Sequence, residues 1–297
     1  MPPEEHLIEP GQQRLILRIT INLDAPFGQI QRAVMRMVDL LSFGLSMTQK
    51  AERNEPLRLP DIFLQLELGS HLPLERLPTE FEVWILGNGL RDVIEALDPF
   101  LAEVWKISSA LKAHAGGPGG PMSKDELIRA LEGLEAGNTA FREFPVAKKL
   151  SRLLDEESSL LPREWKTALF SIINLRNCLV HRRGIVGTRD CDADGIMTVA
   201  WQETRVLIEY EDGSSELLFA GMLTKQAGTV ILKRSWKETK LRLGEQIHFD
   251  TQSFADIVLT LFFGAMHMRE IFLENIKALG IEIASPQQPA PASDTTE

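Results

Sequence analysis

The strongest constraint on the fold is a helical periodicity that runs, with few breaks, from residue 81 to residue 183. In the segment 89–114, apolar side chains recur every three or four residues, which is the spacing of one face of an α-helix. The same periodicity returns at 253–280. An amphipathic helix is stable only when its apolar stripe is covered, so several such helices in one chain predict a helical bundle.

Local signals divide this stretch into separate helices. Proline removes a helical hydrogen bond, so a bend is expected at Pro99, and the glycine-rich residues 116–120 predict a break. A capping pattern before an apolar run predicts a helix over about 124–136. Further helices are expected in 145–158 and over 162–183, where proline precedes the start and glycine follows the end.

Two other parts of the chain have a strand-like pattern. Residues 14–23 and 61–69 alternate apolar and polar side chains, and an amphipathic helix is expected between them over about 27–50. Residues 1–80 are therefore predicted to form a small β-α-β unit. The second β-rich part, at about 190–250, contains alternating runs joined by the turn-prone sequence EDGSS.

The predicted architecture is an α+β fold. A mainly α-helical bundle over 81–280 carries a β-strand insertion at about 190–250, before its last helix, and follows the β-α-β unit. The tail 281–297 is polar and proline-rich, which is typical of disorder.

Composition excludes several classes of protein. Two cysteines in 297 residues provide no disulfide framework and fit a reducing compartment. The N-terminus has no signal-peptide pattern, and no apolar run is long enough to cross a membrane, so a cytoplasmic protein without membrane contact is expected. No metal-ligand spacing, nucleotide-binding glycine motif or Gly-x-Ser-x-Gly motif is present, so neither a metal nor a cofactor is predicted.

The charge is unevenly distributed along the chain. The whole chain has a net charge of −10, yet residues 163–189 and 225–242 each carry +5. Two such basic islands on an acidic protein are consistent with a focused anion-binding face, or with solvated surfaces of unrelated elements.

The segment SIINLRNCLVHRRGIV places polar side chains at the end of an apolar helix. Asn177 and His181 are four residues apart and lie one above the other, with Arg176 about 100° to the side of Asn177. Histidine can transfer protons near neutral pH, and arginine can stabilise an anionic transition state at phosphorus. An RNA strand supplies its own nucleophile, the 2′-hydroxyl, so this combination suits RNA cleavage. Arg182, Arg183 and Arg189 are candidate RNA-binding cations.

The residues Arg176 to His181 resemble the Arg-x4–6-His motif of the HEPN superfamily, in which a polar residue often follows the arginine. The resemblance implies a helical bundle, a homodimer and a metal-independent endoribonuclease acting on single-stranded RNA in a defence or toxin–antitoxin type system. Arg176 and His181 would then be the catalytic pair, with Asn177 in support. A protein partner such as an antitoxin is also implied. Arg242 and His248 satisfy the same spacing, but in a segment predicted as β.

Two alternatives remain open from the sequence. Arg176 could pair with an acidic residue such as Asp155, Glu156 or Glu270, in which case the motif only ends a helix. The protein could also be a non-catalytic HEPN-like dimer that binds a protein or nucleic acid. A ligand-sensing role for the β-α-β unit is a weaker third hypothesis.

Overall fold

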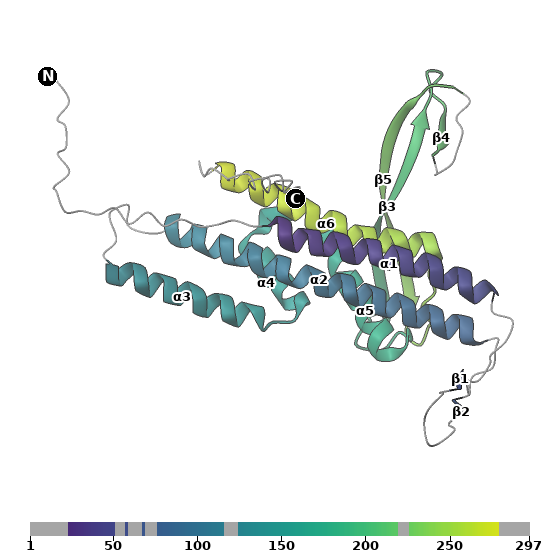
Figure 1. The fold of residues 1–297 in the computed structure, drawn as a ribbon, viewed down its shortest axis with the longest axis horizontal. Coiled ribbons are helices and arrows are strands. Elements are labelled where there is room, and N and C mark those ends of the chain that lie inside the picture. Colours follow the sequence, from purple (N-terminus) through teal and green to yellow (C-terminus); the bar gives the residue numbers. More distant parts are fainter. Residues whose placement is uncertain are drawn as a thin grey trace, which may run out of the picture.

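The computed structural model of the chain describes residues 23–50, 57–58, 67–68, 76–115, 124–218 and 226–278 (Figure 1). The helices are α1 (Asp24–Lys50), α2 (Leu77–Ala115), α3 (Lys124–Arg142), α4 (Val146–Glu156), the 3₁₀ turn η2 (Ser158–Leu160), α5 (Arg163–Arg182) and α6 (Thr251–Ala278). The strands are β1 (Leu57–Arg58), β2 (Glu67–Leu68), β3 (Ile196–Glu209), β4 (Ser215–Leu217) and β5 (Thr229–Arg242). The predicted α+β class, mostly helical, is confirmed for these residues.

Three long helices form the body of the bundle. Figure 1 shows α1, α2 and α6 running side by side, and each contacts the other two. The predicted apolar stripe of α1 faces this core, since Ile30, Val34, Met37 and Leu41 are all buried. The helix assigned from sequence to a separate N-terminal unit therefore shares the bundle's core. Of the strand expected at 14–23, only Leu23 lies within the described residues, and it precedes α1 outside any strand.

The shorter helices pack against α2. The α2 helix continues through Pro99, and α3 and α4 both contact it. Lys149 on α4 is 1% exposed and donates to both carboxylate oxygens of Asp98 on α2 at 2.7 Å. Because the desolvated ammonium needs this carboxylate, the pair fixes α4 against the middle of α2.

The helix that carries the Arg-x4-His motif, α5, ends in a left-handed turn. Arg183 has φ 53° and ψ 36°, and Gly184, with φ 73°, donates its N–H to the Cys178 carbonyl at 3.2 Å. The Arg183 N–H donates to the same carbonyl, so two successive left-handed residues close the helix, and the first of them is arginine rather than the more usual glycine. The chain then turns back along the end of the bundle.

The β-rich segment forms a long hairpin that rises from the bundle (Figure 1). Its strand order is β4-β3-β5, all antiparallel, and Thr204 on β3 lies opposite Arg234 on β5. The turn predicted at EDGSS is confirmed, with Gly213 at φ 79°. The lower half of β3 contacts α5 and α6, whereas its upper half pairs with β4.

Side chains from the helices complete the outer edge of β3 near the bundle. The N–H of Ala200 donates to Ser171 Oγ on α5, and that of Gln202 donates to Thr260 Oγ1 on α6, both at 2.9 Å. The N–H of Thr204 lies 3.5 Å from an oxygen of Asp256. Unpaired strand edges are unfavourable when buried, so these contacts fix the foot of the hairpin between two helices.

In the described residues, no helix is both long and apolar enough to span a membrane. The small β1–β2 ladder pairs Leu57 with Leu68. Of the strand expected at 61–69, only residues 67 and 68 lie within the described part of the chain, and both are in β2.

Candidate functional site

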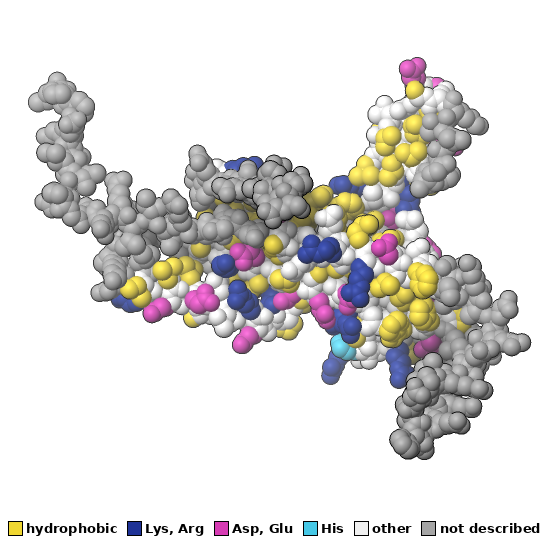
Figure 2. Space-filling model, viewed as in Figure 1, with side chains coloured by type: hydrophobic (Ala, Val, Ile, Leu, Met, Phe, Trp, Pro, Cys, Tyr) yellow, Lys and Arg dark blue, Asp and Glu magenta, His cyan; other side chains and the backbone are white. Residues whose placement is uncertain are grey.

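The three residues of the motif lie together on the last turns of α5. Arg176 Nη1 donates to Asn177 Oδ1 at 3.0 Å, and His181 follows one helical turn after Asn177. Arg176 and Asn177 are half-buried, while His181 is exposed. Figure 2 shows Lys and Arg side chains around a histidine at the lower edge of the bundle, over the part of the molecule where Figure 1 labels α5.

Arg176 is not neutralised by an acidic neighbour in the described part of the chain. Its one hydrogen bond there is the one to Asn177, and its Nε is buried without a partner. Two acidic candidates for a structural ion pair, Asp155 and Glu156, contact other groups: Ser151 reaches Asp155, and Glu156 pairs with Lys112 at 3.2 Å. The guanidinium charge of Arg176 therefore remains available to an anion.

Arg182 has a different environment from its neighbours. Its Nη2 is paired with Asp190, whose side chain is 0% exposed, and the other Asp190 oxygen accepts the Gly187 N–H at 2.9 Å. Asn174 Nδ2 also donates to the Asp190 carbonyl at 2.9 Å. Arg182 thus joins the end of α5 to the loop that follows it, and part of its charge is used in that ion pair.

Arg183 and Arg189 adjoin Arg182 and Asp190 in the sequence, respectively, and both are exposed. The Arg183 carbonyl accepts from Gln246 Nε2 at 3.3 Å, so the backbone of the helix end is held while the guanidinium extends into solvent. Like Arg176, these two exposed arginines have no ion-pair partner in the described residues.

Cys178, between Asn177 and His181, is not suited to nucleophilic chemistry. It is fully buried, and its Sγ lies 3.2 Å from the Ile185 carbonyl. Burial, reinforced by the Asp190 charge, raises the pKa of the Cys178 thiol to about 11. The reactive thiolate is therefore scarce at neutral pH.

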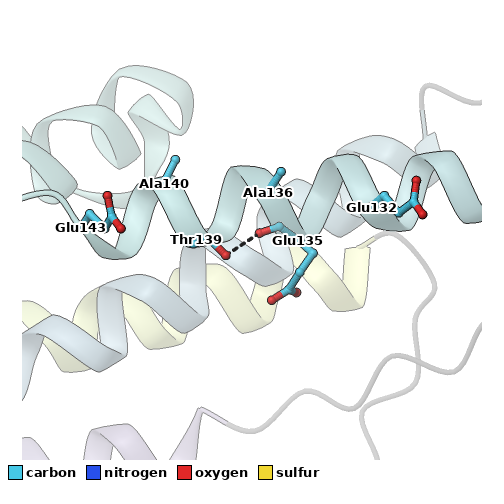
Figure 3. Close-up of a pocket in the computed structure, with 6 residues that line it drawn as sticks. All are labelled: Glu132, Glu135, Ala136, Thr139, Ala140 and Glu143. Carbon is cyan, nitrogen blue, oxygen red and sulfur yellow. Dashed lines mark hydrogen bonds between the residues drawn. The ribbon is translucent and has the colours of Figure 1, made fainter.

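Two surface hollows in the described part of the chain lie away from the motif. Figure 3 shows the first, a shallow depression along α3 lined by Glu132, Glu135, Ala136, Thr139, Ala140 and Glu143. Three carboxylates on one helix repel a phosphate group, so this depression does not suit an RNA strand. The second lies between α1 and α2 and is lined by both positively and negatively charged side chains: Arg32, Arg36, Asp92 and Glu95. Within the described ranges, no group of three or more His, Cys, Asp or Glu side chains is placed to hold a metal ion.

Two features of this region escaped the sequence reasoning. The first is the ion pair of Asp190 with Arg182. Asp190 lies eight residues after Arg182 and beyond a turn, and this spacing is the only indication of the pair in the sequence. Gln246 and its neighbours return from β5 to the α5 end, where Ile247 N donates to the Gly184 carbonyl at 2.8 Å. The second Arg-x5-His pair, Arg242 and His248, lies at the end of β5 and in the coil before α6, not on a helix.

No known protein family, curated protein or solved structure matches this chain.

Proposed function

We propose that the protein is a HEPN-like, metal-independent endoribonuclease that cleaves single-stranded RNA in a defence or toxin–antitoxin type system. The observation that carries the proposal is the state of the motif at the end of α5. Arg176 is hydrogen-bonded to Asn177 but unpaired with any described acid, and His181 is exposed without a bound partner in the described residues. A motif that merely ends a helix would not need a half-buried, unneutralised arginine.

The chemistry follows from these two side chains. The 2′-oxygen of one ribose bonds to the adjacent phosphorus, and the bond from phosphorus to the 5′-oxygen of the next nucleotide breaks. A proton leaves the 2′-hydroxyl and a proton reaches the 5′-oxygen, and His181 performs one of these transfers. Arg176 donates to the phosphate oxygens, where negative charge accumulates, and Asn177 holds the guanidinium in place. The products are a 2′,3′-cyclic phosphate and a 5′-hydroxyl.

The test is cleavage of end-labelled single-stranded RNA in the presence of EDTA. Replacing a general acid or base typically lowers the rate by about 10²- to 10⁴-fold, so His181→Ala should lose activity to that extent. The matched control is His248→Ala, because His248 is also exposed and also follows an arginine at motif spacing. Equal cleavage by wild type and His181→Ala would refute the assignment of the site.

A non-catalytic interaction role is the second candidate, and one observation favours it. Trp84 on α2 is 62% exposed and Ile185 is 48% exposed, and their chain neighbours Val83 and Gly184 pack together. The motif corner therefore has apolar side chains beside it that a partner or a second copy of the chain would cover. If no cleavage occurs, light scattering of wild type and Trp84→Glu distinguishes the two: a dimer that the substitution dissociates supports the interaction role.

A further inference from the structure

The strand β5 presents most of the second basic island. Its side chains from Lys233 to Arg242 include five cations and one acid, and the five cations are all exposed: Lys233, Arg234, Lys237, Lys240 and Arg242. Figure 2 shows Lys and Arg side chains at the foot of the hairpin and acidic side chains at its tip. The positive stretch is therefore bounded above by the acidic turn and continues downward to the bundle.

The position of β5 leaves one side of this strand open. In the described residues β5 is an edge strand that pairs with β3 alone. Neighbouring side chains of a strand point to opposite faces, so Lys233 and Lys237 flank this edge on one face and Arg234 and Lys240 flank it on the other. Two of the lysines contact acids at long range, 3.7 Å for Lys237 to Glu203 and 3.6 Å for Lys240 to Glu238. Exposed pairs of this kind are weak and yield to a phosphate.

An aromatic side chain lies in the middle of the basic stretch. Trp236 is 38% exposed, and its ring meets Trp165 of α5 edge-on at 5.0 Å and 85°. The contact fixes one edge of the indole and leaves other parts of it in solvent. The Arg234 guanidinium is similarly held, 4.9 Å from the ring of Phe263 on α6. An ordered, exposed aromatic ring among cations is the arrangement that stacks bases of single-stranded nucleic acid.

The lower end of β5 leads directly to the motif. Gly244 N donates to the Val186 carbonyl at 2.9 Å, and Val186 N donates to the Glu245 carbonyl at 3.0 Å. Together with the contacts of Gln246 and Ile247 described above, these bonds join the end of β5 to the turn after α5. The segment that follows β5 is thus hydrogen-bonded to Arg183 and Gly184, which are two and three residues after His181 in the chain.

We propose that β5 is an RNA-binding strand that holds single-stranded RNA by its phosphates and by stacking of a base on Trp236, and leads the RNA toward Arg176 and His181. The choice of RNA as ligand rests on the proposed function. The stretch from Lys233 to Arg242 is about 30 Å long, which matches about nine stacked nucleotides. An acidic peptide adding a strand to the same edge is the competing occupant.

The experiment measures RNA binding separately from cleavage. A fluorescent single-stranded uridine oligomer of about 15 nucleotides is titrated with full-length His181→Ala protein in EDTA, at several salt concentrations, and followed by anisotropy. The test variant adds Lys233→Ala and Arg242→Ala, two exposed cations without ion pairs in the described residues. The control variant adds Arg142→Ala and Lys277→Ala, exposed cations on α3 and α6.

Each phosphate contact on a single strand contributes about 0.7 to the slope of log K against log salt. The test variant should therefore flatten that slope by about 1.4 and weaken binding roughly 10- to 30-fold near 0.1 M salt, while the control changes neither. A Trp236→Leu variant should weaken binding at every salt concentration without changing the slope, since stacking is uncharged.

Unchanged affinity and slope in the Lys233/Arg242 variant would overturn the inference, even if His181-dependent cleavage is found. Loss of binding through β5 without any cleavage by wild type would support the inference and count against the proposed function. Binding of a poly-glutamate peptide through Lys233 and Arg242, with no binding of RNA, would overturn the inference in favour of strand addition by a protein.

Discussion

Replacing Asp190 by alanine should destabilise the protein by removing the group that holds the end of α5. The Asp190 side chain is fully buried and accepts from Arg182 and from the Gly187 N–H at 2.9 Å. Each hydrogen bond to a charged group contributes about 1.5–3 kcal/mol, and the Gly187 N–H would be left without this acceptor. Arg182 is 28% exposed and recovers part of its hydration, so the net loss should be about 3 kcal/mol.

Urea denaturation and thermal melting measure this loss. For a chain of this size, with an unfolding entropy of about 2.1 cal/mol/K per residue, about 3 kcal/mol corresponds to a melting temperature lower by about 5 °C. The matched control is Asp194→Ala, because Asp194 is exposed in the same loop and its side chain makes no described contact. The charge contribution alone is measured by Asp190→Asn, which keeps the shape of the side chain and removes its charge.

A double-mutant cycle then isolates the pair. Asp190→Ala and Arg182→Met should each lower the free energy of unfolding, because each leaves the other charge unpaired. The double variant should lose less stability than the sum of the two single losses, because it contains neither charge. If Asp190→Ala melts like Asp194→Ala, or if the two losses are additive, the account of Arg182 as the partner of Asp190 is refuted. Arg182 would then be available for RNA in the same way as Arg183 and Arg189.

Two further predictions concern the core. Burial raises the pKa of Cys178 from 9.0 to about 11, so the folded state holds the thiol proton more tightly than the unfolded state. The contribution of Cys178 to the free energy of unfolding should therefore be complete below about pH 9 and should be lost as the pH rises toward 11. Urea denaturation measures this dependence, and Cys178→Ala should remove it. A methyl group on Gly89 would lie 1.6 Å from Met37 Sδ, so Gly89→Ala should destabilise the protein by about 1–3 kcal/mol in thermal melts. Gly133 has open space around it, so Gly133→Ala should instead stabilise the protein by about 0.5–1 kcal/mol. Equal effects at the two sites would contradict the close packing of α1 on α2.

The sequence predicted helices best where one apolar stripe is complete. The periodicity over 27–50 and 162–183 located α1 and α5 to within a few residues, because each buries one continuous face. The helix expected over 124–136 instead continues to Arg142, past Gly137. Phe141 explains the extension, since it is buried and stacks on Trp105 of α2 with ring centroids 4.3 Å apart. A contact between distant residues decides that helix end, and a local pattern cannot contain it.

At the candidate site, too, the sequence predicted what depends on one helix and missed what depends on contacts between distant residues. Helical spacing was enough to bring Arg176, Asn177 and His181 to one helix end, because it depends on three residues of a single element. The pairing of Arg182 with Asp190 depends on a left-handed turn at Arg183, a conformation that arginine adopts rarely and that no local signal announces. The approach of β5 to the same corner depends on the register of a hairpin whose strands are separated by nineteen residues, from Tyr210 to Gly228.

The edge contacts of β3 limit how the hairpin can shift. One turn of α6, from Asp256 to Thr260, advances about 6 Å, and two residues of β3, from Gln202 to Thr204, advance about 6.7 Å. Side chains of a helix can therefore match the spacing of strand N–H groups over one helical turn, but the two spacings differ increasingly beyond it. From residue 207 onward, β3 pairs with the strand β4 instead. A slip of the hairpin by one residue would bring carbonyls to the places where the N–H groups of Ala200, Gln202 and Thr204 now meet the helices. The helices thus fix the position of the hairpin along α5 and α6, and through the pairing of β3 with β5 they also fix how far each β5 cation lies from the bundle.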